Sequence, residues 1–333
     1  MRISVFCYAL SLGAVVGLLA GCGGSQTPIG APGAMPQGRA MATHAGRGAS
    51  WMLPEARNDD LLYVGNDDRE VYAYSYPRMK LVGQLLGIDA VTGGLCVDKN
   101  GDVFVTTQTN NSKGPTSYVY EFAHGGTNPI ASLQDSYWTS SCAVDQTTGN
   151  LAVTDPVAGN VAIYAKAQGN PTYIGSPVWP NWSAYDNHGN LFVDGQTGNT
   201  GNAPYALTEL PAGGSSFTVV SLNESIGLHA LQWNKGELVT SFRKSIYDTT
   251  LDLYRIKITG TSGRIVGTTI LNIRKKPHYR GQFLILGDNI LAAGAPYACL
   301  QLWHYPSGGD AVKTLVRHLA PWGVVLSKAP SSR

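Results

Sequence analysis

A short unit that recurs along this chain restricts its fold more than any other feature of the sequence. In most copies an apolar strand ends at an Asp, a short turn containing Gly follows, and a second strand reads Leu/Val-x-Val. The copies span residues 95–105, 142–153, 183–193, 231–239 and 283–291. The turn glycines of the first four copies are Gly101, Gly149, Gly189 and Gly236, whose numbers differ by 48, 40 and 47. A period of about 40–50 residues matches one four-stranded sheet of a β-propeller.

Each unit continues into a second pair of strands that are joined by a turn rich in Gly or Pro. The first strand of this pair spans residues 118–122, 161–164, 206–210 and 300–303 in different units. Glycine suits such turns because a tight hairpin needs residues with positive φ. We therefore predict an all-β fold, a six-bladed β-propeller with four-stranded antiparallel blades over residues 58–328.

The two ends of the repeat region complement each other. The first apolar strand, at residues 61–64, matches the second strand of a unit, and the missing first strand is found at residues 323–327. We expect these segments to pair, so that a C-terminal strand beside the N-terminal strand closes the ring and removes the open sheet edges. The alternative, two stacked β-sandwiches, does not require complementary half-units at the termini.

The repeat pattern over about residues 58–328 resembles the class of six-bladed propellers that includes NHL-repeat and SMP-30/gluconolactonase-like proteins. The resemblance implies either a binding platform or a metal-dependent hydrolase, in which acidic and amide side chains of the inner strands hold a divalent cation. Asn181 is the one obvious ligand of that kind, since Gly93 and Ser140 occupy the equivalent positions. We therefore predict no catalytic residue, metal ligand or cofactor, and we expect an enzyme less than a binding protein.

The N-terminus carries an export signal. Met1 and Arg2 precede an almost wholly apolar run to Ala20, and the order Leu-Ala-Gly-Cys ends at Cys22. An apolar run that ends in small residues is typical of a secretory signal, and this order resembles the lipobox of bacterial lipoproteins. The resemblance implies a signal peptide over residues 1–21, lipidation of the Cys22 thiol, and acylation of the new amino group. The alternative is an uncleaved transmembrane anchor, because about eighteen apolar residues can just span a bilayer.

The rest of the chain organisation follows from this anchor. Residues 23 to about 50 show no apolar periodicity, and residues 22–57 are interpreted as the lipidated cysteine and a flexible Gly/Pro/Ala tether. Trp51, Met52, Leu53 and Pro54 break this pattern, so docking of this stretch on the folded body stays open, and residues 329–333 are interpreted as a tail. Gly23 resembles the residue after the cysteine in lipoproteins sorted to an outer membrane, if the cell is Gram-negative. We expect a monomer in the cell envelope, attached to the membrane through lipid. A net charge of +2 argues against nucleic acid as a partner.

Tryptophans gather in the segments that lead into the predicted inner strands, at one mouth of the central channel. An aromatic rim with a few polar groups suits a protein, peptide or glycan ligand. The predicted ligand-binding residues are Trp138, Trp179, Asn181, Trp182, His229, His278, Tyr279, Arg280 and Trp322. The alternative is that the tryptophans pack between blades, which we favour for any single tryptophan but not for the whole set.

Two further residue sets have alternative interpretations. The recurring Asp98, Asp145 and Asp186 could form a ring of carboxylates around a cation, but turn formation is favoured because a short Gly turn follows each. Beyond the signal segment, three cysteines form an odd set, which argues against a full disulfide framework. A small buried apolar role is favoured for Cys142, and a bridge to Cys96 stays open.

Overall fold

The computed structural model describes most of the chain beyond residue 48. The described residues are 49–66, 69–88, 91–108, 110–111, 114–115, 117–135, 138–198, 203–243, 248–273, 281–294, 299–317 and 321–330. They belong to a compact unit formed by residues 47–333. The predicted signal peptide, Cys22 and most of the tether lie outside the described residues. Within those ranges, no helix has the length and apolar character needed to cross a membrane.

Strands make up almost all of the regular structure. The described residues form no α-helix and two short 3-10 helices, η1 (Pro54–Arg57) and η2 (Ala165–Ala167). The predicted all-β fold is therefore confirmed. The strands carry long runs of buried residues, because most of them are covered by neighbouring sheets on both faces.

The first sheet brings together the two ends of the folded region. Its strands, in spatial order, are β1 (Trp51–Met52), β4 (Lys80–Leu85), β3 (Val71–Tyr76), β2 (Asp60–Asn66) and β27 (Pro321–Ser327). β27 runs antiparallel to β2, with Leu61 opposite Ser327 and Val64 opposite Val324. The pairing predicted between residues 61–64 and 323–327 is thus present.

Residues 51–57 lie on this sheet, although the predicted tether included them and docking was left open for residues 51–54 alone. β1 pairs with β4, the backbone N–H of Leu53 donates to the Val82 carbonyl at 2.7 Å, and Ala56 is fully buried. The apolar residues in this short stretch explain the difference, because they cover the outer edge of the sheet. The folded body therefore includes residues that precede position 58.

Two separate sheets follow in chain order, each with four strands. The second sheet has the order β10 (Pro129–Asp135), β9 (Ser117–Phe122), β6 (Val103–Gln108) and β5 (Val91–Val97). The third has the order β11 (Ser141–Val144), β12 (Leu151–Asp155), β13 (Asn160–Tyr164) and β14 (Thr172–Gly175). A small hairpin of β7 (Asn110–Asn111) and β8 (Gly114–Pro115) extends from the connection between β6 and β9.

The remaining twelve strands form one large sheet made of three antiparallel sets. The first set is β15 (Trp179–Tyr185), β16 (Leu191–Gln196), β17 (Tyr205–Leu210) and β18 (Thr218–Leu222). The second is β19 (His229–Asn234), β20 (Glu237–Phe242), β21 (Thr250–Thr259) and β22 (Ser262–Asn272). The third is β23 (Phe283–Leu286), β24 (Asn289–Gly294), β25 (Cys299–His304) and β26 (Gly308–Arg317). Short parallel pairings of β22 with β18 and with β26 join the sets at their outer strands.

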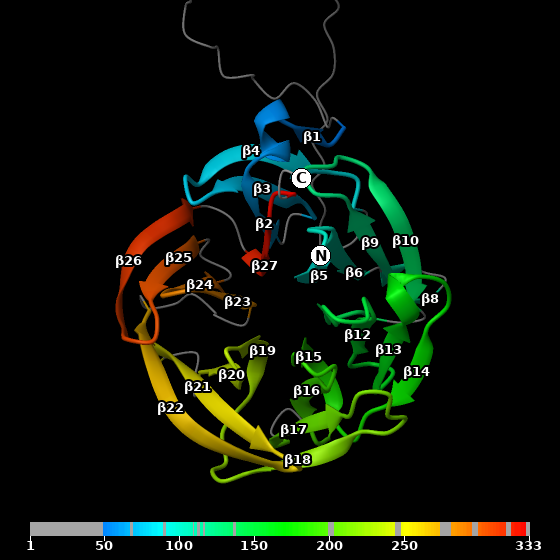
Figure 1. Cartoon of the computed structure of the whole chain (residues 1–333), viewed down its shortest axis with the longest axis vertical. Coiled ribbons are helices and arrows are strands. Elements are labelled where there is room, and N and C mark those ends of the chain that lie inside the picture. Colours follow the sequence, from blue (N-terminus) through cyan, green and yellow to red (C-terminus); the bar gives the residue numbers. More distant parts are fainter. Residues whose placement is uncertain are drawn as a thin grey trace, which may run out of the picture. The chain divides into compact units, whose positions relative to one another are not determined.

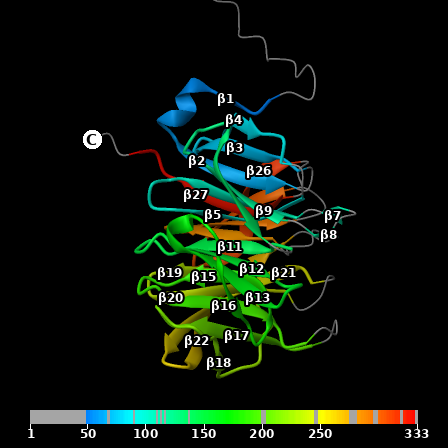
Figure 2. The same ribbon diagram turned by 90° about the vertical axis from the view of Figure 1, so that its right-hand side faces the viewer.

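The sheets are arranged around a common centre (Figure 1), with β10, β14, β18, β22 and β26 at the periphery and β27, β5, β15, β19 and β23 near the middle. The innermost strands contact one another in the order β27, β5, β11, β15, β19, β23, and β23 contacts β27. In the side view the strands run across the unit, and the β7–β8 hairpin marks one of its two ends (Figure 2). We call the end where the innermost strands begin the entry end, and the opposite end the turn end.

The apolar core is divided into clusters that lie between neighbouring sheets. Val103 and Val105 of β6 pack with Leu61 and Tyr63 of the first sheet, whereas Phe104 packs with Val153 of the third. Alternate residues of one strand therefore bury against different neighbours, because successive side chains point to opposite faces. Each sheet is fixed by the sheets on either side of it.

Candidate functional site

The innermost strands are irregular near the entry end. The pairing of β15 with β16 shifts register between Pro180 and Ser183, so that Asn181 and Trp182 form a bulge. β5 shifts in the same way between Thr92 and Leu95, at Gly93 and Gly94. A bulge inserts extra backbone and redirects a side chain, so these positions can present groups that a regular strand could not.

Polar side chains of the second strands support these bulges. The Thr106 hydroxyl on β6 donates to the Gly94 carbonyl at 2.8 Å. On β16, the Asp194 carboxylate accepts the backbone N–H of Trp182 at 2.8 Å. The Thr154 hydroxyl on β12 reaches the neighbouring set and donates to the Asn181 carbonyl at 2.8 Å. Hydrogen bonds of this kind satisfy backbone groups that the bulge removes from the strand ladder.

Trp182 lies among the innermost strands. Its side chain is partly buried and packs against the apolar clusters on both sides of the β19–β22 set. The ring also approaches β5, because a Cβ atom placed on Gly94 would lie 3.4 Å from Trp182 Cζ3. Trp182 therefore bridges several sheets, and much of its ring is already engaged by the protein itself.

Gln282 ties three innermost segments together. Its amide nitrogen donates to the Leu95 carbonyl at 2.8 Å, and its amide oxygen accepts the N–H groups of Leu95 at 3.2 Å and Val324 at 3.1 Å. The backbone N–H of Gln282 donates to the Trp322 carbonyl at 2.8 Å. One side chain thus links the segment before β23 to both β5 and β27.

The other predicted site residues occupy different environments at the entry end. Trp179 is the most exposed of the tryptophans in the described residues, at 39 %. Trp138, Asn181, His229 and Trp322 are partly buried. The His229 ring meets the ring of Tyr205 edge-on, with centroids 4.9 Å apart, and the ring of Phe242 at 6.3 Å. His278, Tyr279 and Arg280 lie outside the described residues.

Three buried carboxyl groups near this end, those of Asp135, Asp155 and Asp194, were not predicted from the sequence. Asp194 on β16 is fully buried, which raises its pKa to about 7 against the opposing hydrogen bond from Trp182. Burial also raises the pKa of Asp155 on β12 to about 6; hydrogen bonds from backbone N–H groups lower it, and nearby Asp135 raises it further. A signal was present, since an Asp follows the apolar run of each strand, but the repeat pattern alone does not show which way that side chain points.

The recurring aspartates of the unit lie at the turn end and shape the turns there. Asp98 Oδ1 accepts the N–H groups of Asn100 and Asp102, both at 2.8 Å. Asp186 Oδ1 accepts those of His188 at 2.8 Å and Asn190 at 2.9 Å. This is the side-chain turn pattern typical of Asp, so the interpretation as turn residues is confirmed.

The alternative of a metal-dependent hydrolase receives no support from the described residues. Among them, no group of three or more His, Cys, Asp or Glu side chains is arranged to hold a metal ion. Asn181, the one predicted candidate, contributes its backbone carbonyl to the contact with Thr154.

Cys96 and Cys142 form a disulfide bond, with their Cα atoms 5.7 Å apart. The bond joins β5 to β11, the innermost strands of the second and third sheets, and both residues are buried. The favoured apolar role for Cys142 was therefore incomplete. The two cysteines are offset by one position within the repeat unit, and the spacing of the sequence units does not reveal that they lie at disulfide distance.

The arrangement of sheets around a centre is that of a β-propeller-type fold, and comparison with one known structure agrees. A chain in the crystal structure of a nidogen/laminin complex matches with a TM-score of 0.58 and 12 % identity, over 81 % of this chain and 98 % of that chain. A hydrazine synthase chain from Kuenenia stuttgartiensis matches with a TM-score of 0.49 and 13 % identity, over 66 % and 64 %. At such identities the first match shows the fold alone.

Comparison with protein-family models and with curated proteins gave no match. The class of protein is therefore defined by its fold, as an all-β protein of the β-propeller type.

Proposed function

We propose that this chain is a lipid-anchored protein of the cell envelope, whose six-bladed β-propeller is a platform for binding a protein, peptide or glycan. The six-bladed ring is supported by the circular order of contacts among the six innermost strands and by the pairing of β27 with β2. It also agrees with the NHL-repeat and SMP-30-like pattern of the sequence.

The β-propeller-type fold is the observation that carries the platform function. Its sheets are cross-linked near the centre by the Cys96–Cys142 bond and by the hydrogen bonds of Gln282. A frame held in this way presents its loops and strand ends with little loss of conformational entropy on binding. The matched nidogen/laminin structure is itself a complex of two proteins, which agrees with a role in protein interaction.

The disulfide bond also supports export from the cytoplasm. Such bonds form and persist in oxidising compartments and are rare in the cytosol. A buried disulfide in the body and a lipobox-like Leu-Ala-Gly-Cys at the N-terminus thus indicate the same location by independent routes. In a Gram-negative cell, that location is the outer membrane or the periplasmic face of the envelope.

The anchor is tested by replacing Cys22. Cells that express the full chain should incorporate labelled palmitate into the protein and retain it in the membrane fraction, because two acyl chains anchor stably. The Cys22→Ser variant should lose the label and its precursor should remain unprocessed. Labelling of Cys22→Ser at the wild-type level would show that the lipid is elsewhere or that the anchor is wrong.

The binding platform is tested at the entry end. We expect Trp179→Ala combined with Trp138→Ala to abolish recovery of envelope partners by the full chain after cross-linking, without lowering its melting temperature. Ile270→Ala, which truncates an exposed apolar residue on β22, is the matched control. If the double variant and the control recover the same partners as the wild type, the entry end is not the binding surface.

A further inference from the structure

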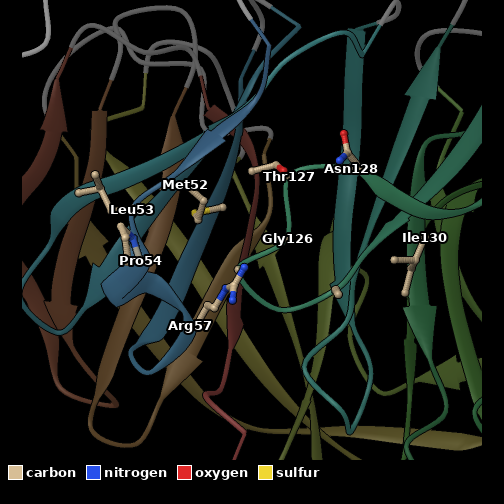
Figure 3. Close-up of a pocket in the computed structure, with 10 residues that line it drawn as sticks. Met52, Leu53, Pro54, Arg57, Gly126, Thr127, Asn128 and Ile130 are labelled. Atoms are coloured by element: carbon tan, nitrogen blue, oxygen red, sulfur yellow. The ribbon is translucent and has the colours of Figure 1, made fainter.

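A cavity of about 610 Å³ lies beside the segment where the folded body begins. One wall consists of Met52 and Leu53 with Pro54 and Arg57 of η1, and the other includes Thr127 and Asn128 of the turn before β10 and Ile130 of β10 (Figure 3). Cavities of several hundred cubic ångströms with mainly apolar walls and a few polar groups are typical of binding sites. The cavity is bordered by the turn between β9 and β10, which lies at the turn end. The segments that lead into the innermost strands, and that carry the predicted tryptophans, lie at the entry end.

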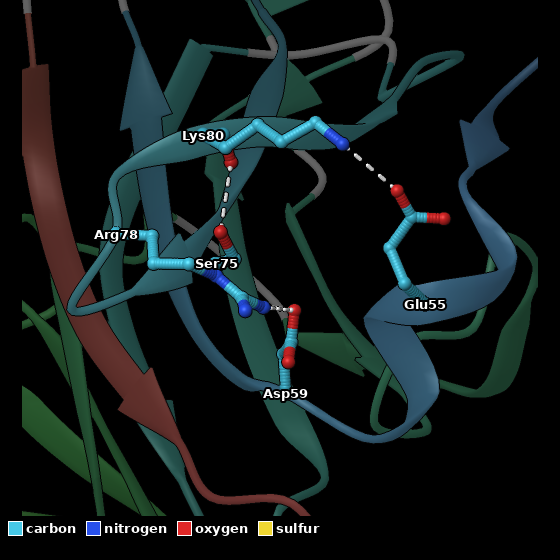
Figure 4. Close-up of polar contacts among 5 residues, drawn as sticks. All are labelled: Glu55, Asp59, Ser75, Arg78 and Lys80. Atoms are coloured by element: carbon cyan, nitrogen blue, oxygen red, sulfur yellow. Dashed lines mark hydrogen bonds and ion pairs between the residues drawn. The ribbon is translucent and has the colours of Figure 1, made fainter.

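The charge of Arg57 is directed at this cavity. In the same short segment, Glu55 forms an ion pair with Lys80 at 2.9 Å, and Asp59 forms one with Arg78 (Figure 4). Both acidic residues are thus engaged, Asp59 by the turn between β3 and β4 and Glu55 by the first residue of β4. Arg57 is exposed, its side chain points into the space near Gly126 (Figure 3), and no carboxylate in the described ranges forms an ion pair with it. The cavity therefore offers a cationic group beside apolar walls.

The outer edge of the second sheet borders the same cavity. β10 is the last strand of its sheet and pairs only with β9 among the described residues. Ile130 on this edge is 58 % exposed. In the first sheet the equivalent outer edge is covered by an added strand, because β1 pairs with β4. Trp51 lies opposite Gln84 there, and its indole N–H donates to the Gln84 side-chain oxygen at 3.1 Å. The edge of β10 carries no such added strand in the described part of the chain.

We propose that an extended segment of a partner protein pairs with the edge of β10, places an apolar side chain in the cavity, and sets an acidic side chain against Arg57. In strand addition, main-chain hydrogen bonds give affinity and pockets for side chains give specificity. The partner is recognised as a strand-forming peptide with an Asp or Glu next to a large apolar residue. This surface is distinct from the entry end, so it goes beyond the platform function proposed above.

Selection from a random peptide library tests the chemistry of the partner. Displayed peptides are selected on the full chain in detergent, and affinities of the enriched peptides are then measured on variants. We expect them to combine an acidic residue with a neighbouring large apolar one. Arg57→Glu should lower their affinity by about tenfold or more, because a charge-assisted hydrogen bond becomes a repulsion. Arg264→Glu, at an exposed arginine on β22, is the matched control and should leave affinity unchanged.

Hydrogen exchange then locates the bound peptide. Protection should appear over residues 129–135 and 52–57, and Ile130→Ser, which leaves the strand backbone intact, should weaken binding as well. Protection confined to residues 138–182 would overturn the proposal, and so would equal peptide affinities of Arg57→Glu and Arg264→Glu. Neither result would exclude binding at the entry end, which is tested separately. Two other outcomes would also overturn the proposal, because the bound segment would then belong to this chain. One is that a peptide of residues 23–48 competes with the selected peptides. The other is that the full chain associates with itself and that Arg57→Glu abolishes this association.

Discussion

Asp194 places an ionisable group where water does not reach it. The carboxyl group is fully buried on β16, one oxygen accepts the Trp182 N–H, and the other has no hydrogen-bond partner among the described residues. A protonated carboxyl group suits such a site better than a carboxylate, because burial penalises the charged form. The raised pKa of about 7 expresses this preference.

The raised pKa has a defined effect on stability. In the unfolded chain Asp194 titrates near its ordinary pKa of 3.8, and in the folded protein near 7. Its contribution to stability is therefore fully present below about pH 4 and is lost as the pH rises toward 7. We expect the free energy of unfolding to fall over this range, and Asp155, with a pKa of about 6, should add to the decrease.

Asp194→Asn isolates that contribution. The amide keeps an oxygen for the Trp182 N–H and has no charge to bury, so the variant should be more stable than the wild type at pH 8 by about 2 kcal/mol. Its stability should also vary less between pH 4 and 8. Denaturant unfolding across that range measures both, with Asp310→Asn on the exposed side of β26 as the control. A wild-type protein whose stability rises with pH over this interval would contradict the assignment.

Between neighbouring sheets, the Cys96–Cys142 bond is the one disulfide in the described residues. It joins residues separated by 46 positions. Closing a loop of that size restricts the unfolded chain by about 3–4 kcal/mol in the chain-entropy model. The bond therefore matters most for how firmly β5 and β11 are held side by side.

Removal of the bond measures this contribution to stability. Cys96→Ala with Cys142→Ala should lower the free energy of unfolding by about 3 kcal/mol, measured by denaturant unfolding under oxidising conditions. Cys299→Ala in β25, outside the bond, should have a smaller effect. If reductant leaves the unfolding midpoint of the wild-type protein unchanged, the bond is not formed in solution.

Gln282 links sheets by hydrogen bonds at the same level of structure. Gln282→Ala would leave the N–H groups of Leu95 and Val324 and the Leu95 carbonyl without this partner. Each buried backbone group deprived of its partner costs about 1–3 kcal/mol unless water replaces it, so we expect a loss of about 2–4 kcal/mol. Gln282→Glu keeps the acceptor and loses the donor, and it should fall between the wild type and the alanine variant. Equal unfolding midpoints for all three proteins would show that these bonds add nothing.

The same elements show what the sequence could predict. The apolar pattern of residues 95–105 and its copies correctly located the strand pairs of the repeat, because the apolar alternation and the turn glycine are local signals. The complementary strand at 323–327 was found because the first unit lacked one. The position of Gln282 and the Cys96–Cys142 bond depend on distances between innermost strands of different units. Such distances are set by the packing of whole sheets and leave no local signal.

The candidate site was predicted less completely for the same reason. The entry segments were recognised from their tryptophans, but Trp182 turned out to pack against two apolar clusters, which depends on the bulge beside it. Asp194 was overlooked because a strand residue can face either of the two neighbouring sheets. Its side chain is directed toward the bulge of β15, where it accepts the Trp182 N–H, and nothing in the spacing of the repeats marks that bulge.

At the scale of the whole molecule, stability depends on the two ends of the folded region meeting. β27 supplies Val324 and Val325 to two different apolar clusters and forms the pairing partner of β2. A chain that ends before residue 321 should therefore expose the edge of β2 and leave both of these clusters incomplete. We expect it to lose the cooperative unfolding transition and to aggregate, as followed by near-ultraviolet circular dichroism and size-exclusion chromatography.

A milder change separates this role from a general effect of truncation. Val325→Pro removes one backbone donor and restricts the strand opposite Tyr63, and it should lower the melting temperature strongly. A substitution at the exposed Lys328 beyond the strand should not. A cooperative, wild-type-like transition in the truncated chain would mean that the remaining sheets are stable without β27.

The pairing of β2 with β27 also determines when this protein can finish folding. The ribosome makes residues 60–66 early, and it makes residues 321–327 after the strands of all the other sheets. Until then the first sheet lacks its innermost strand and presents an open edge to other chains. A newly made molecule therefore exposes this edge to its neighbours until residues 321–327 emerge, and completion of the first sheet is a late event that the intervening sheets can prepare but cannot replace.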